Sequence, residues 1–271
     1  MNRIGNNIKL VVGIIFLMSN SVIAQQELYE AKMFINNTDT LNYRIMYPKD
    51  FSADKQYPLI LFLHGAGERG SNNASQLVHG SKLFAEEMNR GAFPALVIFP
   101  QCPQKEYWSN AIIDRNTKPI SLVYPQNAPP TKALSLVMLL MDDYLNKPFI
   151  NKEKIYIGGL SMGGMGTFEM LYRKPDTFAA AFTICGGGNP ETAKAYAKNT
   201  ELWVFHGAKD DVVDPQLSIH MVSAYLKAGG KPNFTLYADD NHNSWDSAFA
   251  EPKLLTWLFS KSKTKKNETP N

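Results

Sequence analysis

The sequence lacks the features that mark several specialised protein classes. Its 271 residues include two cysteines, Cys102 and Cys185, which are too few for the disulfide framework of a small secreted domain. It has no H-E-x-x-H pattern and no paired C-x-x-C, so no metal site is predicted, and no G-x-G-x-x-G opens a nucleotide site. We therefore expect a protein that works without a metal or a cofactor.

A strong charge of either sign is also missing. The formal net charge is +3, but residues 1–24 hold two basic residues, and residues 260–271 hold four lysines and one glutamate. Between these ends, 22 basic residues stand against 24 acidic ones, a net charge of about −2. A nucleic-acid-binding surface needs clustered positive charge, so we expect no nucleic-acid partner.

Residues 1–24 have the pattern of a secretory signal peptide. Arg3 and Lys9 supply positive charge, residues 10–18 are an apolar run, and Val22-Ile23-Ala24 suits cleavage after Ala24. Nine apolar residues are too few to span a bilayer, which needs about 20. We expect export to the periplasm or beyond the cell, with an uncleaved N-terminal anchor as the alternative.

Export has a consequence for the two cysteines. In an oxidising compartment Cys102 and Cys185 could pair, and two free buried thiols are the alternative. Residues 260–271 contain no apolar side chain and are expected to form a solvated, disordered tail.

Between these ends, apolar runs alternate with helical patterns. The chain is 44% hydrophobic and 20% charged, enough to bury a substantial core, and we find no linker within it. Continuous apolar runs, typical of parallel strands buried on both faces, cover 59–63, 95–99, 154–157, 178–184, 202–205 and 234–237. Helical patterns cover 133–145, 162–172, 215–227 and 253–259. The alternation predicts one α/β domain over 25–259, with a mostly parallel sheet covered by helices on both faces.

Two segments depart from this alternation. Residues 33–35 and 41–47 alternate in period two around 36–39, which predicts an N-terminal antiparallel hairpin. Residues 101–130 have no regular pattern, and so long a loop is usually functional. We expect this loop to overhang the site, with Trp108 and Tyr107 stacking on a sugar or aryl ring of the substrate, or else packing the loop down.

Ligands of such sheets bind beyond the carboxyl ends of the strands, and one of these ends carries a nucleophile motif. Ser161 lies in Gly159-Leu160-Ser161-Met162-Gly163, between a predicted strand and a predicted helix. A serine on so tight a turn is strained and exposes its hydroxyl, and the flanking glycines leave room for the neighbouring turn. We predict that Ser161 is a nucleophile.

A serine needs a base, and the base needs an orienting acid. His242 follows the last predicted strand and is the predicted base, whereas His220 lies in a helical pattern. Asp210, on the turn after the strand that ends in His206, is the predicted acid, with Asp211 as the alternative. Asp214, directly before Pro215, fits a helix cap better.

An acyl-transfer reaction also needs donors for the oxyanion. The backbone N–H of Met162 is one predicted donor, and Ala66 is the second, with Gly67 as the alternative. Gly65 of the same loop and Trp245, three residues after His242, are predicted to contact substrate, although a tryptophan so placed more often packs its loop.

These motifs together resemble the α/β-hydrolase superfamily. They are Leu63-His64-Gly65-Ala66-Gly67-Glu68-Arg69-Gly70, Pro100-Gln101-Cys102-Pro103, Gly159-Leu160-Ser161-Met162-Gly163-Gly164, Cys185-Gly186-Gly187-Gly188, His206-Gly207-x-x-Asp210 and His242-Asn243-Ser244-Trp245-Asp246. Within that superfamily, the chain is similar to the phospholipase/carboxylesterase and dienelactone-hydrolase-like group, although dienelactone hydrolases use a cysteine nucleophile. The resemblance implies an α/β-hydrolase fold and the catalytic roles of Ser161, Asp210 and His242.

The sequence therefore predicts an exported serine esterase. Its expected substrates are small-molecule or carbohydrate esters, including acyl and feruloyl esters, and this step rests on analogy with neighbouring families. A serine peptidase of the prolyl-oligopeptidase-like type and a catalytically silent binding protein on the same scaffold are the alternatives. The oligomeric state is left open.

Overall fold

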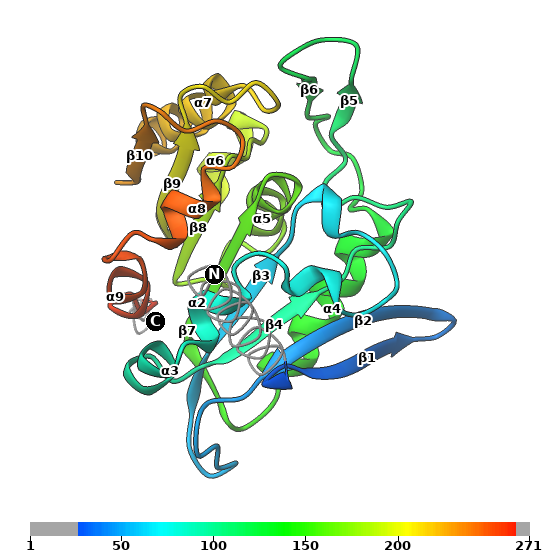
Figure 1. The fold of residues 1–271 in the computed structure, drawn as a ribbon, viewed down its shortest axis with the longest axis vertical. Helices are drawn as coiled ribbons and strands as arrows, with labels where there is room; N and C mark the ends of the chain where they lie inside the picture. The colour runs from blue at the N-terminus through cyan, green and yellow to red at the C-terminus, as the bar shows by residue number, and fades with distance from the viewer. Residues whose placement is uncertain (1–26, 264–271) are drawn as a thin grey trace, which may run out of the picture.

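The computed structural model describes residues 27–263, and within them eight strands form one sheet (Figure 1). The predicted signal peptide and the part of the predicted tail after Lys263 lie outside these residues. The strand order is β1-β2-β4-β3-β7-β8-β9-β10. The bounds are β1 Glu30–Asn36, β2 Asp39–Met46, β3 Tyr57–Leu63, β4 Leu96–Pro100, β7 Ile150–Leu160, β8 Ala180–Ile184, β9 Glu201–Gly207 and β10 Asn233–Tyr237.

The strand directions agree with the predicted fold class. β1 pairs with β2, and β2 with β4, in antiparallel register, which confirms the N-terminal hairpin. All neighbours from β4 through β3, β7, β8 and β9 to β10 are parallel. The predicted mostly parallel sheet is therefore confirmed. Because parallel strands end at the same edge, the turns after β3, β7, β9 and β10 lie together there.

Helices cover both faces of the sheet, and each face has its own core. Along β3, Leu59, Leu61 and Leu63 face one core, whereas Ile60 and Phe62 face the other. Helices α4 (Lys132–Leu145), α5 (Met162–Arg173), α6 (Ala193–Tyr196) and α7 (Pro215–Lys227) pack into the first core. Helices α2 (Ser81–Ala85), α8 (Trp245–Phe249) and α9 (Leu254–Phe259) pack into the second. Helix α3 (Glu87–Ala92) follows α2, and short 3₁₀ turns are η1 (Ala66–Glu68), η2 (Ser75–Leu77) and η3 (Pro190–Thr192).

Two expectations about irregular segments need correction. Residues 101–130 contain a small antiparallel hairpin, β5 (Ile112–Asp114) and β6 (Ser121–Val123), which projects from the body in Figure 1. The predicted tail begins later than residue 260, because the Lys263 N–H donates to the Glu153 carbonyl at 2.9 Å and Tyr156 Oη donates to the Lys261 carbonyl at 2.7 Å. Three-residue strands and backbone hydrogen bonds leave no periodic signal in the sequence, which explains both differences.

Within residues 27–263, no helix has both the length and the apolar character that crossing a bilayer needs.

Candidate active site

Ser161 occupies a strained turn at the carboxyl end of β7. Its φ and ψ are 52° and −117°, a backbone conformation that L residues rarely adopt, and α5 begins at the next residue. The two glycines of the motif permit this turn. A Cβ on Gly163 would lie 1.9 Å from the Leu63 carbonyl oxygen, and a Cβ on Gly159 would lie 2.3 Å from the Gly163 carbonyl oxygen. Glycine is therefore required at both positions for close packing of β3, β7 and α5.

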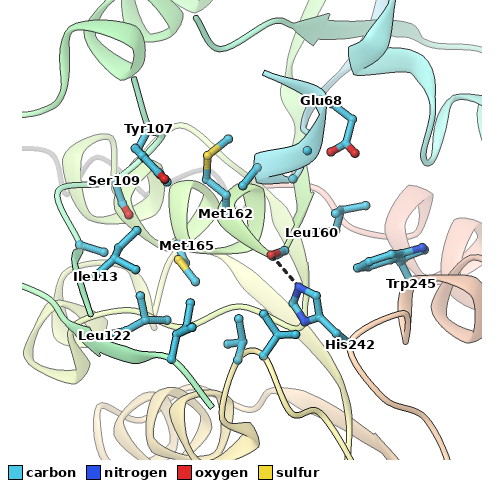
Figure 2. Close-up of a pocket in the computed structure, with 18 of the residues that line it drawn as sticks. Glu68, Tyr107, Ser109, Ile113, Leu122, Leu160, Met162, Met165, His242 and Trp245 are labelled. Carbon is cyan, nitrogen blue, oxygen red and sulfur yellow. Dashed lines mark hydrogen bonds between the residues drawn. The ribbon is translucent and has the colours of Figure 1, made fainter. Parts of the chain in front are cut away.

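The loop after β10 brings His242 to this serine. Ser161 Oγ lies 3.0 Å from His242 Nε2, and His242 Nδ1 lies 2.8 Å from Asp210 Oδ2 (Figure 2 shows the serine contact). Three side chains from three separate turns are thus joined in one hydrogen-bonded series. Because an ionised carboxylate only accepts, Nδ1 carries the proton and Nε2 is free to take the proton of the serine hydroxyl.

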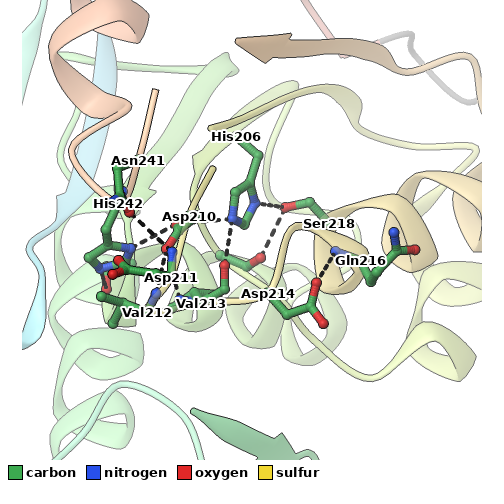
Figure 3. Close-up of polar contacts among 12 residues, drawn as sticks. His206, Asp210, Asp211, Val212, Val213, Asp214, Gln216, Ser218, Asn241 and His242 are labelled. Carbon is green, nitrogen blue, oxygen red and sulfur yellow. Dashed lines mark hydrogen bonds and ion pairs between the residues drawn. The ribbon is translucent and has the colours of Figure 1, made fainter. Parts of the chain in front are cut away.

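Asp210 is held by more groups than the sequence suggested. Its Oδ1 accepts the backbone N–H groups of Val212 and Val213, both at 2.9 Å, and its Oδ2 lies 3.1 Å from Nε2 of the buried His206 (Figure 3). Burial alone raises the pKa of Asp210, but the hydrogen bonds from His206, His242 and Val213 outweigh this and hold the pKa well below its usual range. The Asp210 carboxylate is therefore ionised at neutral pH and accepts the Nδ1 proton of His242.

The other candidate acids and histidines lie elsewhere. The Asp211 side chain is exposed, and the backbone N–H of Asp211 donates to Asn241 Oδ1 at 3.0 Å. Asp214 caps α7 by accepting the Gln216 N–H at 2.8 Å, as predicted. His220 is an exposed residue of α7. The structure thus brings Asp210, and not Asp211, to His242.

The two predicted oxyanion donors begin two helical segments beside the serine. Met162 is the first residue of α5 and Ala66 is the first residue of η1, and both line the same cavity as Ser161. The first N–H groups of a helix have no partner within the helix, so they are available to a ligand. Gly65 lines the cavity as well, and a Cβ there would lie 2.8 Å from the Leu160 side chain.

The cavity over Ser161 has a volume of about 240 Å³. On one side of the serine its walls are largely apolar and come from α5, the turn after Asp210 and the β5–β6 hairpin, with Tyr107, Ser109 and Arg115 as the polar members (Figure 2). The apolar residues are Met162, Met165, Ile113, Ile120, Leu122, Val212 and Val213. The hairpin is fixed over the cavity because the Ile120 N–H donates to the Val212 carbonyl at 2.9 Å. The 101–130 segment thus overhangs the serine, but short strands gave no signal that its aliphatic residues would form the wall.

Two of the predicted aromatic contacts have different outcomes. Trp245 lines the cavity, and its ring meets the His242 ring edge-on at 5.4 Å between centroids. Trp108 is fully buried and does not line the cavity, so its predicted contact with substrate is wrong. Its indole N–H donates to the His64 carbonyl at 3.1 Å, and its Cβ lies where a side chain on Gly166 would stand. Trp108 therefore packs against the end of β3 and supports the Gly65–Gly67 loop that follows. Its neighbour Tyr107 lines the cavity.

His64 has a structural position, as a strand-end histidine bonded to backbone. Its Nδ1 lies 2.6 Å from the Gly65 carbonyl oxygen, and its Nε2 accepts the Cys102 N–H at 2.9 Å. Burial lowers the pKa of His64 to about 4, so the ring is neutral with the proton on Nδ1. The ring ties the end of β3 to the segment after β4.

Two features bear on cofactors. The spacing G-x-G-x-x-G does occur at residues 65–70, but the 3₁₀ turn η1 lies within it and no long helix follows it directly, so it does not build a dinucleotide site. Cys185, Asp210 and His242 place potential metal ligands within 4.8 Å of one another. The Asp210 oxygens are already hydrogen-bonded, and burial raises the pKa of the Cys185 thiol well above its usual range, which disfavours a thiolate ligand. Cys102 and Cys185 are both free and buried.

Comparisons with known proteins agree with this geometry. Residues 122–253 match the phospholipase/carboxylesterase family. Mouse lysophospholipase-like protein 1 is 27% identical over 210 residues, covering 74% of this chain and 86% of the mouse protein. A thermostable esterase superposes with a TM-score of 0.77 at 32% identity, over 88% of this chain and 64% of the esterase. This chain therefore spans less than two thirds of the length of that esterase. A ferulic acid esterase superposes with a TM-score of 0.64 at 18% identity, over 85% of this chain and 98% of that chain, and this likeness concerns the fold alone.

Proposed function

Because the chain belongs to the α/β-hydrolase superfamily and is an esterase-like hydrolase, we propose that it cleaves carboxylic esters with Ser161 as nucleophile. The observation that carries this proposal is the continuous hydrogen-bonded series from Ser161 through His242 to Asp210, with contacts of 3.0 and 2.8 Å. A scaffold that only bound its ligand would have no use for this series beside a strained serine.

The reaction follows from the positions of these groups. Ser161 Oγ attacks the ester carbonyl carbon while His242 Nε2 takes the hydroxyl proton, and the N–H groups of Met162 and Ala66 hold the oxyanion. The carbon–oxygen bond to the alcohol then breaks, and the alcohol oxygen receives the proton from His242. Water next attacks the acyl carbon and gives one proton to His242. The bond between that carbon and Ser161 Oγ then breaks, Oγ takes the proton back from His242, and the carboxylic acid is released.

The cavity limits the size of the acyl group. Its volume of about 240 Å³ lies below the range of roughly 300–1,000 Å³ common for drug-sized ligands. Its apolar side, with Met165, Ile113 and Leu122, has room for a short alkyl chain or one aryl ring. We therefore propose small acyl or feruloyl esters, including those of carbohydrates, as the substrates.

Export is proposed on the sequence of residues 1–24 alone. If the signal peptide is cleaved after Ala24, N-terminal sequencing of the protein from the periplasm or medium will begin at Gln25. Protein that keeps Met1 in the membrane fraction would instead support an uncleaved anchor.

The test of the proposed function is the hydrolysis of p-nitrophenyl acetate by the wild type and by Ser161→Ala. We expect the variant to lose at least about 10³-fold in kcat with unchanged circular dichroism. Full activity in Ser161→Ala would refute the nucleophile. An aminoacyl p-nitroanilide, assayed in parallel, tests the peptidase alternative, because preference for that amide over the ester would favour a peptidase.

A further inference from the structure

The position of His242 assigns the two sides of the cavity to the two halves of an ester. His242 Nε2 must pass its proton to the oxygen of the departing alcohol, so the alcohol lies on the His242 side of Ser161 and the acyl group on the other. In Figure 2, Ile113, Leu122 and Met165 lie on the acyl side, whereas Glu68 and Trp245 lie on the His242 side.

Glu68 brings an unused hydrogen-bond acceptor to this side. It lines the cavity with a side chain that is 14% exposed, and its Oε2 is buried without a hydrogen-bond partner among the described residues. An unpaired buried carboxylate oxygen is costly, and a ligand hydroxyl would remove the cost.

Two basic groups near Glu68, His64 and Arg69, do not satisfy Oε2. His64 Nδ1 lies 4.0 Å from Oε2, but this nitrogen faces the Gly65 carbonyl and the buried ring is neutral. The guanidinium of Arg69 donates to the carbonyls of Ala66 and Glu106, at 2.9 and 3.3 Å, and packs over the Tyr107 ring. The Glu68 carboxylate therefore keeps unsatisfied acceptor capacity at the wall of the cavity.

His79 and Trp245 complete this part of the wall. His79 Nε2 lies 3.8 Å from Glu68 Oε1, and the His79 ring packs against Trp245 at 5.1 Å between centroids. A hydroxyl both donates and accepts, so neighbouring hydroxyls can bond to Glu68 and to His79 at once. An indole beside them offers an apolar surface to the carbon skeleton of the same molecule.

We propose that Glu68, His79 and Trp245 form the subsite for the departing alcohol and select a polyhydroxylated alcohol, such as a sugar, through a hydroxyl donated to the Glu68 carboxylate. This proposal rests on the proposed ester hydrolysis at Ser161. It assigns the specificity for the alcohol to the side of the cavity opposite the aliphatic residues of the β5–β6 hairpin.

The test compares three esters of one acid, namely 6-O-acetylglucose, ethyl acetate and acetylcholine, by the acetate they release. We expect the wild type to prefer the sugar ester. In Glu68→Leu, the ratio of kcat/KM for the sugar ester to that for ethyl acetate should fall about tenfold or more, mainly through KM. Glu68→Gln keeps an acceptor of the same shape and should give an intermediate ratio. Glu87→Leu, at an exposed residue of α3, is the matched control and should leave both rates unchanged.

Each other outcome has a definite meaning. Equal losses on all three esters in Glu68→Leu would make Glu68 a support of the Gly65–Gly67 loop and overturn the proposal. A selective loss on acetylcholine, or a wild type without preference for the sugar ester, would overturn it as well. If Glu68→Leu does not fold, Trp245→Leu replaces it, with the same lowered ratio expected. A wild type inactive on all three esters and on p-nitrophenyl acetate would instead refute the proposed function.

Discussion

Asp210 Oδ2 lies 3.1 Å from Nε2 of the buried His206 as well as 2.8 Å from Nδ1 of His242. His206 is itself fixed, because its Nδ1 lies 2.7 Å from Ser218 Oγ and its Nε2 lies 3.0 Å from the Val213 carbonyl oxygen (Figure 3). The carboxylate that orients His242 is therefore positioned from the interior of the protein. A small displacement of His206 would move the whole series that ends at Ser161.

Substitution of the two neighbouring aspartates tests this assignment. Asp210→Asn presents an amide to His242 Nδ1 and favours the wrong tautomer, so we expect kcat for p-nitrophenyl acetate to fall by about 10⁴-fold. Asp211→Asn changes an exposed side chain, and its effect should be less than about threefold. Steady-state kinetics of both variants decide the matter, and a large loss confined to Asp211→Asn would contradict the assignment.

The pH dependence of kcat/KM tests His242. The base must be neutral to take the serine proton, so activity should fall on the acid side as the imidazole protonates. Asp210 stays ionised across that range, because its hydrogen bonds hold its pKa well below the usual range. We therefore expect one ionisation, with log kcat/KM falling by about one for each pH unit. A profile that is flat from pH 5 to pH 8 would argue against a histidine base.

The sequence predicted the parts of the site that depend on strand ends. Ser161, Asp210 and His242 each follow a strand whose apolar run is visible in the sequence, and parallel pairing gathers those ends at one edge. The strained φ of Ser161 and the crowding at Gly163 are direct consequences of the motif that indicated them. Order along the chain was therefore enough to place these side chains near one another.

The parts of the site that the sequence did not predict depend on contacts between segments distant in the chain. Trp108 was expected either to contact substrate or to pack its loop down, and its full burial against His64 is decided by packing that no local pattern records. The contact of His206 with Asp210 depends on the rotamers of both side chains. Glu68 and His79 come together only because the segment after β3 folds back over the sheet edge. Single-residue positions in loops are thus the least predictable part of the site.

His64 supplies a prediction about stability. Its pKa is lowered by burial from about 6.5 to about 4, so between these values the unfolded chain binds a proton that the folded chain does not. The stabilisation is fully present above pH 6.5 and is lost as the pH falls toward 4, by about 2 to 3 kcal/mol at pH 4.5. Asp210 contributes to a separate, more acidic window, because its pKa is depressed and its stabilisation is lost only as the carboxylate protonates.

Urea unfolding of the wild type and of His64→Gln at pH 7.0 and pH 4.5 measures the contribution of His64 to stability. The wild type should lose about 2 to 3 kcal/mol more than the variant over this interval, and equal losses in the two proteins would mean that the buried ring does not resist protonation.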